Sequence, residues 1–135
     1  MNRFAREIYR LATEGYCCSQ ILLKIGLDSR GDDTPELLDA VAGLCHGMFS
    51  GLCCGTLTGA ACLLSLYDKH NAAAHMIPEL VEWFQATCAS ASYGGISCDD
   101  IIEADAVKKV ERCPKLMLET LEECRELLAQ FGHEL

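Results

Sequence analysis

The stretch GLCHGMFSGLCCGTLTGAAC, residues 43–62, is the part of the sequence that decides the fold. Glycine returns at every fourth position of it, at Gly43, Gly47, Gly51, Gly55 and Gly59, and residues 40–67 contain no Asp, Glu, Lys or Arg. Glycine at this density lets two backbones, or a backbone and a bound group, approach closely. The stretch also carries the adjacent pair Cys53 and Cys54. We therefore expect a buried, glycine-rich segment whose residues take part in any chemistry that the protein performs.

The composition of the whole chain limits the class of protein. With 135 residues, half of them hydrophobic, the chain suits one helical domain, residues 1–135, with a substantial core. The formal net charge is −9, and Lys and Arg are scattered rather than gathered in a stripe. Nucleic-acid binding would lack its main attractive force, so no nucleic-acid partner is expected.

The ten cysteines raise the question of the compartment. The N-terminal segment MNRFAREIYR alternates charged and apolar residues and has no hydrophobic region or cleavage site of a secretory signal. We therefore expect a cytoplasmic protein, in which a scaffold of disulfides is not expected. Cytosolic cysteines in this number indicate metal binding or redox chemistry.

The uncharged segment 40–67 is long enough to span a bilayer, and this alternative has to be weighed. It contains five glycines and several polar residues, its ends are Asp39 and Asp68, and no cluster of Lys or Arg flanks it. These features give no orientation signal for a membrane helix. The sequence favours a buried pair of helices broken by glycine, and no membrane span.

Apolar residues recur at helical spacing along most of the chain. They predict helices over residues 2–14, from residues 16–19 onward, from Pro35, from about Cys53 to Lys69, and from Pro78. A short helix is expected after Ser97, and a long one that starts at Pro114. No segment alternates apolar and polar residues as strands do. The fold class predicted is an all-α bundle of about five or six helices with a glycine- and cysteine-rich central segment.

The predicted helices divide the cysteines into two classes. Mid-helix cysteines on apolar faces are expected to behave as small buried hydrophobic residues, and these are Cys62, Cys88 and Cys124. Cys45 is intermediate, and the adjacent His46 is favoured as a structural histidine. Cysteines at predicted helix starts meet free backbone N–H groups, which lower the pKa of a thiol. These are Cys17, Cys18, Cys53, Cys54, Cys98 and Cys113.

No two cysteines have C-x-x-C spacing, so any site must be assembled from distant segments. The segments GYCCSQILL, CGTLTGA, GGISCDDII and ERCPKLM resemble, in order and spacing, the C-GCAxxG-C-C family of redox-active proteins. The resemblance implies that the four family cysteines are Cys18, Cys54, Cys98 and Cys113, and we expect them to converge. It also implies a transporter-associated system as partner, since some members are encoded near transporters. The family prefers Ala where this chain has Thr56, a difference expected to leave the sulfur chemistry unchanged.

Three functions remain open at this point. In the first, Cys18, Cys54, Cys98 and Cys113 carry thiol–disulfide or electron-transfer chemistry with an unknown redox partner. In the second, the same four thiolates bind a metal ion or an iron–sulfur cluster, with Cys17 and Cys53 as substitute ligands. In the third, the protein is structural and its cysteines are buried packing. The sequence leaves open whether the protein is an enzyme, whether it holds no cofactor, a metal ion or a cluster, and whether it forms an oligomer.

Overall fold

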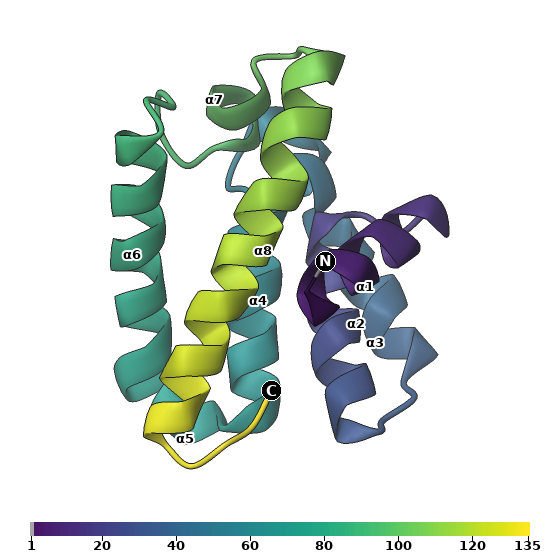
Figure 1. Cartoon of the computed structure of the whole chain (residues 1–135), viewed down its shortest axis with the longest axis vertical. Coiled ribbons are helices and arrows are strands. Elements are labelled where there is room, and N and C mark those ends of the chain that lie inside the picture. The colour runs from purple at the N-terminus through teal and green to yellow at the C-terminus, as the bar shows by residue number, and fades with distance from the viewer. Residues whose placement is uncertain (1) are drawn as a thin grey trace.

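Helix α4 (Gly55–Tyr67) runs through the middle of the molecule, and the other long helices are arranged around it. The computed structural model describes residues 2–135. In it α4 packs against α2 on one side and against α6 and α8 on the other (Figure 1). Buried residues lie on all sides of α4, among them Leu57, Ala60 and Leu64. A helix that is apolar all round belongs in a core, and this explains its central place.

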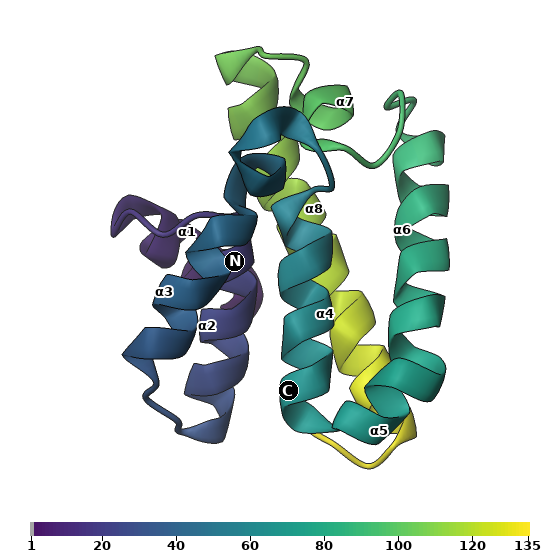
Figure 2. The same ribbon diagram turned by 180° about the vertical axis from the view of Figure 1, so that it is seen from behind.

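The N-terminal third forms α1 (Arg3–Thr13), α2 (Cys18–Arg30) and α3 (Pro35–Val41). Helix α1 buries Phe4, Ile8 and Leu11 and packs against α8 and α2, while α3 covers the outer side of α2. Viewed from behind, α3 and α2 lie together on the side of α4 away from α6 (Figure 2). The N-terminal residues thus close one flank of the bundle.

The glycine-rich segment does not continue α3 directly into α4. It forms a short turn η1 (Ala42–Leu44) and a second short segment η2 (Gly47–Gly51). Within and beside η2 the backbone is left-handed at His46, Gly47, Met48, Phe49 and Gly51. The sequence prediction that these glycines interrupt the helix is confirmed, and α4 then begins at Gly55.

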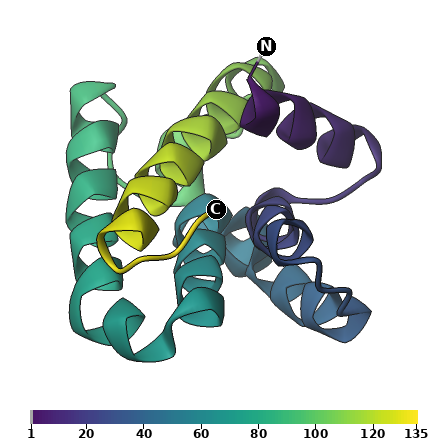
Figure 3. The ribbon, with the colours of Figure 1, turned by 60° about the horizontal axis from the view of Figure 1, so that its bottom comes forward.

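The chain then turns back through α5 (Lys69–Asn71), η3 (Ala72–Met76) and α6 (Ile77–Ser90). Helix α6 buries Leu80, Phe84 and Cys88 against the core. A short helix α7 (Cys98–Ile102) follows, and the side chain of Ser97 accepts a hydrogen bond from the Asp100 N–H as predicted. Seen from below, α8 crosses diagonally between α6 and the N-terminal helices (Figure 3).

The predicted start of the last helix is wrong. Helix α8 spans Ala106–Gln130, so Pro114 and Cys113 lie inside it rather than at its beginning. Asp105 caps the helix by accepting hydrogen bonds from the N–H groups of Val107 and Lys108. Pro114 has no backbone N–H, so the helix loses one hydrogen-bond donor there. The carbonyl that loses this donor belongs to Val110, which is exposed to water. The extra two turns bring Lys109 and Cys113 onto one face.

The all-α fold class is therefore confirmed. Within residues 2–135, six helices have seven residues or more, and the secondary structure is helical apart from one isolated pair of bridged residues. In the same part of the chain, no helix combines the length and the apolar content that crossing a membrane requires. The uncharged segment that raised this question is divided between α3, two short turns and α4.

Candidate functional site: a cavity lined by four cysteines

Four cysteines from four separate segments line one small cavity. Its volume is about 20 Å³, and its lining consists of Cys18, Cys54, Cys98, Cys113, His46, Gly55, Ile101, Ile102 and Lys109. A cavity of this size has room for about one water molecule. The predicted convergence of the four family cysteines is confirmed. Their chemical roles remain predictions.

A pair of backbone hydrogen bonds brings Cys54 and Cys98 together. Cys54 donates its N–H to the carbonyl of Ile96 at 3.1 Å, and Cys98 donates to the carbonyl of Leu52 at 2.6 Å. Cys53 and Ser97 form the isolated antiparallel bridge between these bonds. The bridge ties the start of α4 to the start of α7, so two cysteines far apart in sequence face the same cavity.

Helix packing supplies the other two cysteines. Cys18 is the first residue of α2, and Gly55 at the start of α4 packs against it. A β-carbon built at Gly55 would lie 3.5 Å from the β-carbon of Cys18 and 3.2 Å from the Leu44 carbonyl oxygen. Cys113 reaches the cavity from the middle of α8, one helical turn after Lys109. The start of α4 is thus in van der Waals range of Cys18, and the tightest approach at position 55 is to the Leu44 carbonyl.

Cys18 is the acidic thiol of the site. Hydrogen bonding from the side chain of Cys113 lowers the pKa of Cys18 to about 7, with smaller help from Thr56, Lys109 and its own backbone N–H at the helix start, against an opposing effect of burial. The same interaction raises the pKa of Cys113, because the proton then stays on Cys113. The proton stays on Cys113 because Thr56, Lys109 and the Cys18 N–H at the helix start all favour the thiolate at Cys18. Burial and the neighbouring thiols instead raise the pKa of Cys113.

The other helix-start cysteines do not follow the prediction. Burial, and then the negative charge of Cys18, raise the pKa of Cys54 to about 12, although the N–H groups of Thr56 and Leu57 act in the opposite direction. Burial and the charge of Cys18 also raise the pKa of Cys98. Burial raises the pKa of Cys53, which does not line the cavity. Among these cysteines Cys18 is therefore the one whose pKa is lowered, and there the Cys113 thiol contributes most and the helix N–H group least.

Lys109 and His46 are members of the site that sequence reasoning did not select. Lys109 is the cation whose charge favours the Cys18 thiolate. Burial and the charge of Lys109 lower the pKa of His46, so the imidazole facing the thiols is neutral near pH 7. The four-residue spacing between Lys109 and Cys113 was the available signal. It was missed because the long helix was expected to start at Pro114.

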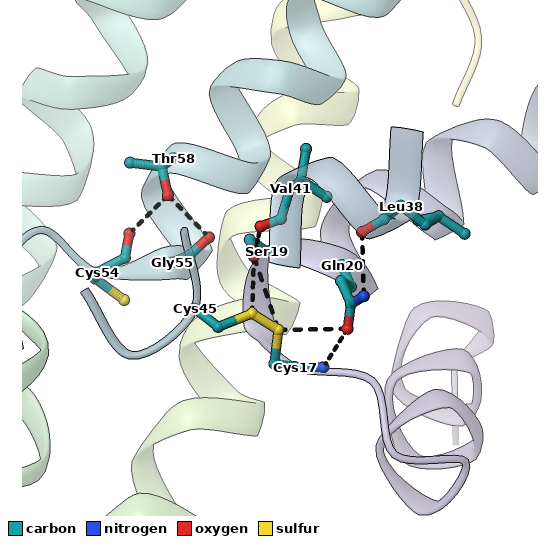
Figure 4. The surroundings of a disulfide bond; sticks show 9 residues. All are labelled: Cys17, Ser19, Gln20, Leu38, Val41, Cys45, Cys54, Gly55 and Thr58. Atoms are coloured by element: carbon teal, nitrogen blue, oxygen red, sulfur yellow. Dashed lines mark hydrogen bonds between the residues drawn. A yellow bond between two sulfur atoms is a disulfide. The ribbon is translucent and has the colours of Figure 1, made fainter. Parts of the chain in front are cut away.

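Cys17 and Cys45 form a disulfide beside the first turn of α2 (Figure 4). Their α-carbons are 6.0 Å apart, an ordinary separation for a disulfide. Ser19 lies beside the bond, with its hydroxyl 3.1 Å from the Cys45 sulfur, and donates a hydrogen bond to the Val41 carbonyl at 2.8 Å. The pairing of Cys17 with Cys45 was not predicted from the sequence. Because Cys17 is bonded to Cys45 and lies outside the lining, it does not substitute for Cys18.

The remaining cysteines behave largely as packing residues. Cys88 and Cys124 are fully buried, as predicted for mid-helix cysteines, and Cys62 is partly buried. Burial, with the nearby carboxylates of Asp100 and Glu119, raises the pKa of Cys88 to about 11. Burial also raises the pKa values of Cys124 and Cys62.

The four cysteines of the cavity do not have the spacing of a metal site. Across residues 2–135, no three or more His, Cys, Asp or Glu side chains are grouped closely enough to hold a metal ion. The donor chemistry of four thiols suits zinc or an iron–sulfur cluster, but their spacing in this structure does not. We therefore assign no ligand set.

The fold and the site define an all-α protein in which four cysteines from distant segments line one cavity. The family described as "Putative redox-active protein (C_GCAxxG_C_C)" matches residues 16–127. The chain belongs to this family. No curated protein and no solved structure matches the chain.

Proposed function

We propose that the protein carries out thiol–disulfide redox chemistry in which Cys18 is the nucleophile and Cys113 the resolving thiol. The observation that carries this proposal is the interaction of these two thiols across the cavity, which lowers the pKa of Cys18 to about 7. A lowered pKa increases the thiolate fraction of Cys18 near neutral pH, and the thiolate is the reactive form. Membership of a family described as redox-active agrees with this chemistry.

The reaction needs two thiols and an oxidised sulfur substrate. The Cys18 thiolate attacks one sulfur of a substrate disulfide, a mixed disulfide forms, and the first substrate thiolate leaves and takes up a proton. The sulfur of Cys113 then attacks Cys18, its proton passes to the second leaving thiolate, and a Cys18–Cys113 disulfide remains. Two electrons have moved from the protein to the substrate disulfide. Cys54 and Cys98, whose thiols stay protonated at neutral pH, complete the cysteine set as reserve reductants beside this pair.

The protein disulfide must be reduced again by a thiol partner. Family resemblance favours a partner in a transporter-associated system, and we expect the reaction in the cytoplasm. The partner and the location are not needed for the test below.

The test is a time course of alkylation followed by mass spectrometry, on anaerobically purified protein whose metal content and visible spectrum are recorded first. At about pH 6.5 we expect Cys18 to label before the other free cysteines. In Cys113→Ala the pKa of Cys18 should rise toward its usual value, so labelling should slow by about tenfold. Mild oxidation of the parent should yield the Cys18–Cys113 disulfide.

Cys62→Ala is the matched control, because Cys62 is a partly buried free cysteine outside the cavity. This variant should label at Cys18 as fast as the parent protein does. Labelling of Cys18 no faster than Cys53, or a purified protein that holds stoichiometric metal or a coloured cluster, would contradict the proposal.

A further inference from the structure

Thr56 carries a buried hydroxyl group without a hydrogen-bond partner. The residue is 1% exposed, and its Oγ1 is the buried side-chain nitrogen or oxygen atom that lacks a partner within residues 2–135. Buried polar groups in native proteins are almost always hydrogen-bonded, so each exception needs an explanation. The exception here lies in the turn of α4 that follows the cavity-lining residues Cys54 and Gly55.

The Thr56 hydroxyl, unlike that of Thr58, has no hydrogen-bond partner within its own helix. Thr58, two residues later, approaches the carbonyl oxygens of Cys54 and Gly55 at 3.4 Å, as buried threonines in helices commonly do (Figure 4). Thr56 is the second residue of the helix, and the carbonyl four residues before it belongs to Leu52. That carbonyl accepts the N–H of Cys98 across the bridge.

The cysteine cavity lies next to this unpartnered hydroxyl. Thr56 directly follows Gly55, where a built β-carbon would lie 3.5 Å from the β-carbon of Cys18. A donor at this position lowers the pKa values of Cys18 and Cys54, because it favours their thiolate forms. Alanine, which the family motif prefers at this position, could not supply this donor.

We propose that Thr56 is a positioning residue that donates its hydroxyl hydrogen to the sulfur of Cys18 when that sulfur is a thiolate. This inference rests on the proposed function and names a residue that stabilises its nucleophile. A donor with no partner in the resting site gains one when the thiol loses its proton, because a thiolate accepts hydrogen bonds more strongly than a thiol. The expectation that a threonine here leaves the sulfur chemistry unchanged is thereby replaced.

The other titratable groups that line the cavity with Cys18 come from each element packed around it. They are Lys109 and Cys113 on α8, Cys54 before α4, Cys98 on α7 and His46 before η2. The test must therefore separate Thr56 from these charges and thiols. A change that removes only the hydroxyl does so, because it leaves every one of these groups in place.

Thr56→Val removes the hydroxyl and keeps the shape of the side chain. We expect the pH midpoint of Cys18 alkylation to rise by about half to one unit, so that labelling at about pH 6 slows by about threefold to tenfold. Thr56→Ser should restore the parent profile, since serine carries the same donor. Thr58→Val should leave the profile unchanged, because the Thr58 hydroxyl bonds to its own helix.

Thermal melting of the reduced variants supplies the second readout. A hydroxyl with no partner does not stabilise the resting fold, so Thr56→Val should melt at the parent temperature or above it. An unchanged Cys18 midpoint in Thr56→Val, or a midpoint that Thr56→Ser does not restore, overturns the inference. A melting temperature lowered well below that of Thr58→Val overturns it too, since the hydroxyl would then be structural. If Cys18 of the parent already titrates like an ordinary cysteine, the proposed function fails first, so the two failures are distinguishable.

Discussion

Cys18 and Cys54 occupy similar positions at the start of a helix, yet their thiols differ widely in acidity. The pKa of Cys18 is lowered to about 7, and that of Cys54 is raised to about 12. Both sulfurs have nearby helix N–H groups, so the helix dipole cannot account for the difference. Cys18 has in addition the Cys113 thiol and the charge of Lys109, whereas Cys54 is buried and faces the negative charge of Cys18. Two anions in so small a cavity repel each other, so only one thiol ionises near neutral pH.

This difference predicts an order of labelling within the cavity. In the folded, reduced protein, an alkylating reagent at about pH 7 should modify Cys18 and leave Cys54 unmodified over the same period. The same reagent applied to the unfolded protein should modify both at similar rates, because burial and the neighbouring charge are then lost. Peptide mass spectrometry reads both positions in one sample. Faster labelling of Cys54 in the folded state would contradict the assignment of Cys18 as the nucleophile.

Some features of the individual site residues could be predicted from the sequence, and others could not. The four cysteines were identified by family resemblance and by their predicted helix starts, and the structure places all four at the cavity. Which one ionises could not be predicted, because the answer depends on burial and on Lys109, which lies far from Cys18 in the sequence. The pairing of Cys17 with Cys45 was not predictable either, since adjacent cysteines at a helix start face different neighbours only once the helices pack.

At the scale of elements, the contact between α2 and α4 fixes the position of Cys18. Gly59 lies at the closest point of this contact, where a β-carbon would be 2.7 Å from the Ser19 α-carbon and 2.8 Å from its carbonyl oxygen. Both atoms belong to the backbone of α2 and cannot move aside without shifting the helix. Ser19 also directly follows Cys18, so a shift of α2 would move the nucleophile.

Gly59→Ala should therefore destabilise the protein by about 1–3 kcal/mol, despite the better helix propensity of alanine. Denaturant unfolding measures this change, and a slower Cys18 reaction should accompany it. Gly43→Ala is the matched control, since a β-carbon at Gly43 meets nothing within 4 Å and its backbone is not left-handed. That variant should be close to neutral. Equal stability of the two variants would show that the close approach at Gly59 is not needed.

Some boundaries of the helices could be predicted from the sequence, and others could not. Apolar spacing predicted α1, α4 and α6 and the break at Gly47–Gly51, because these features depend on local chemistry. The start of α8 was misplaced because Pro114 is a typical first-turn residue and only the caps at Asp105 reveal the earlier start. The bridge between residues 52–54 and 96–98 could not be predicted, since it pairs two loops with no local pattern.

At the scale of the whole molecule, the two ends of the bundle are held together in different ways. The cysteine cavity lies at one end, where α2, α4, α7 and α8 meet. At the other end Asp68 joins α4, α5 and the C-terminal residues: it caps α5 by accepting the Asn71 N–H at 3.1 Å and pairs with the His133 ring at 2.9 Å. The cap and the contact between Asp68 and His133 tie the end of α8 to the turn between α4 and α6.

This tie predicts how stability depends on pH in acid. Hydrogen bonds from the Asn71 side chain, from His133 and from the Asn71 N–H lower the pKa of Asp68 to about 2, below its usual value of 3.8. A carboxyl group whose pKa is lowered in the folded state stabilises the fold above its ordinary pKa, and this contribution is lost as the pH falls toward the lowered value. The melting temperature of the parent should therefore exceed that of Asp68→Asn at about pH 6, and the difference should shrink between about pH 4 and pH 2. Asp39→Asn, which changes an exposed carboxylate on α3, should show no such convergence. A difference between the parent and Asp68→Asn that stays constant down to about pH 2 would show that the charge of Asp68 is not what holds the C-terminus in place.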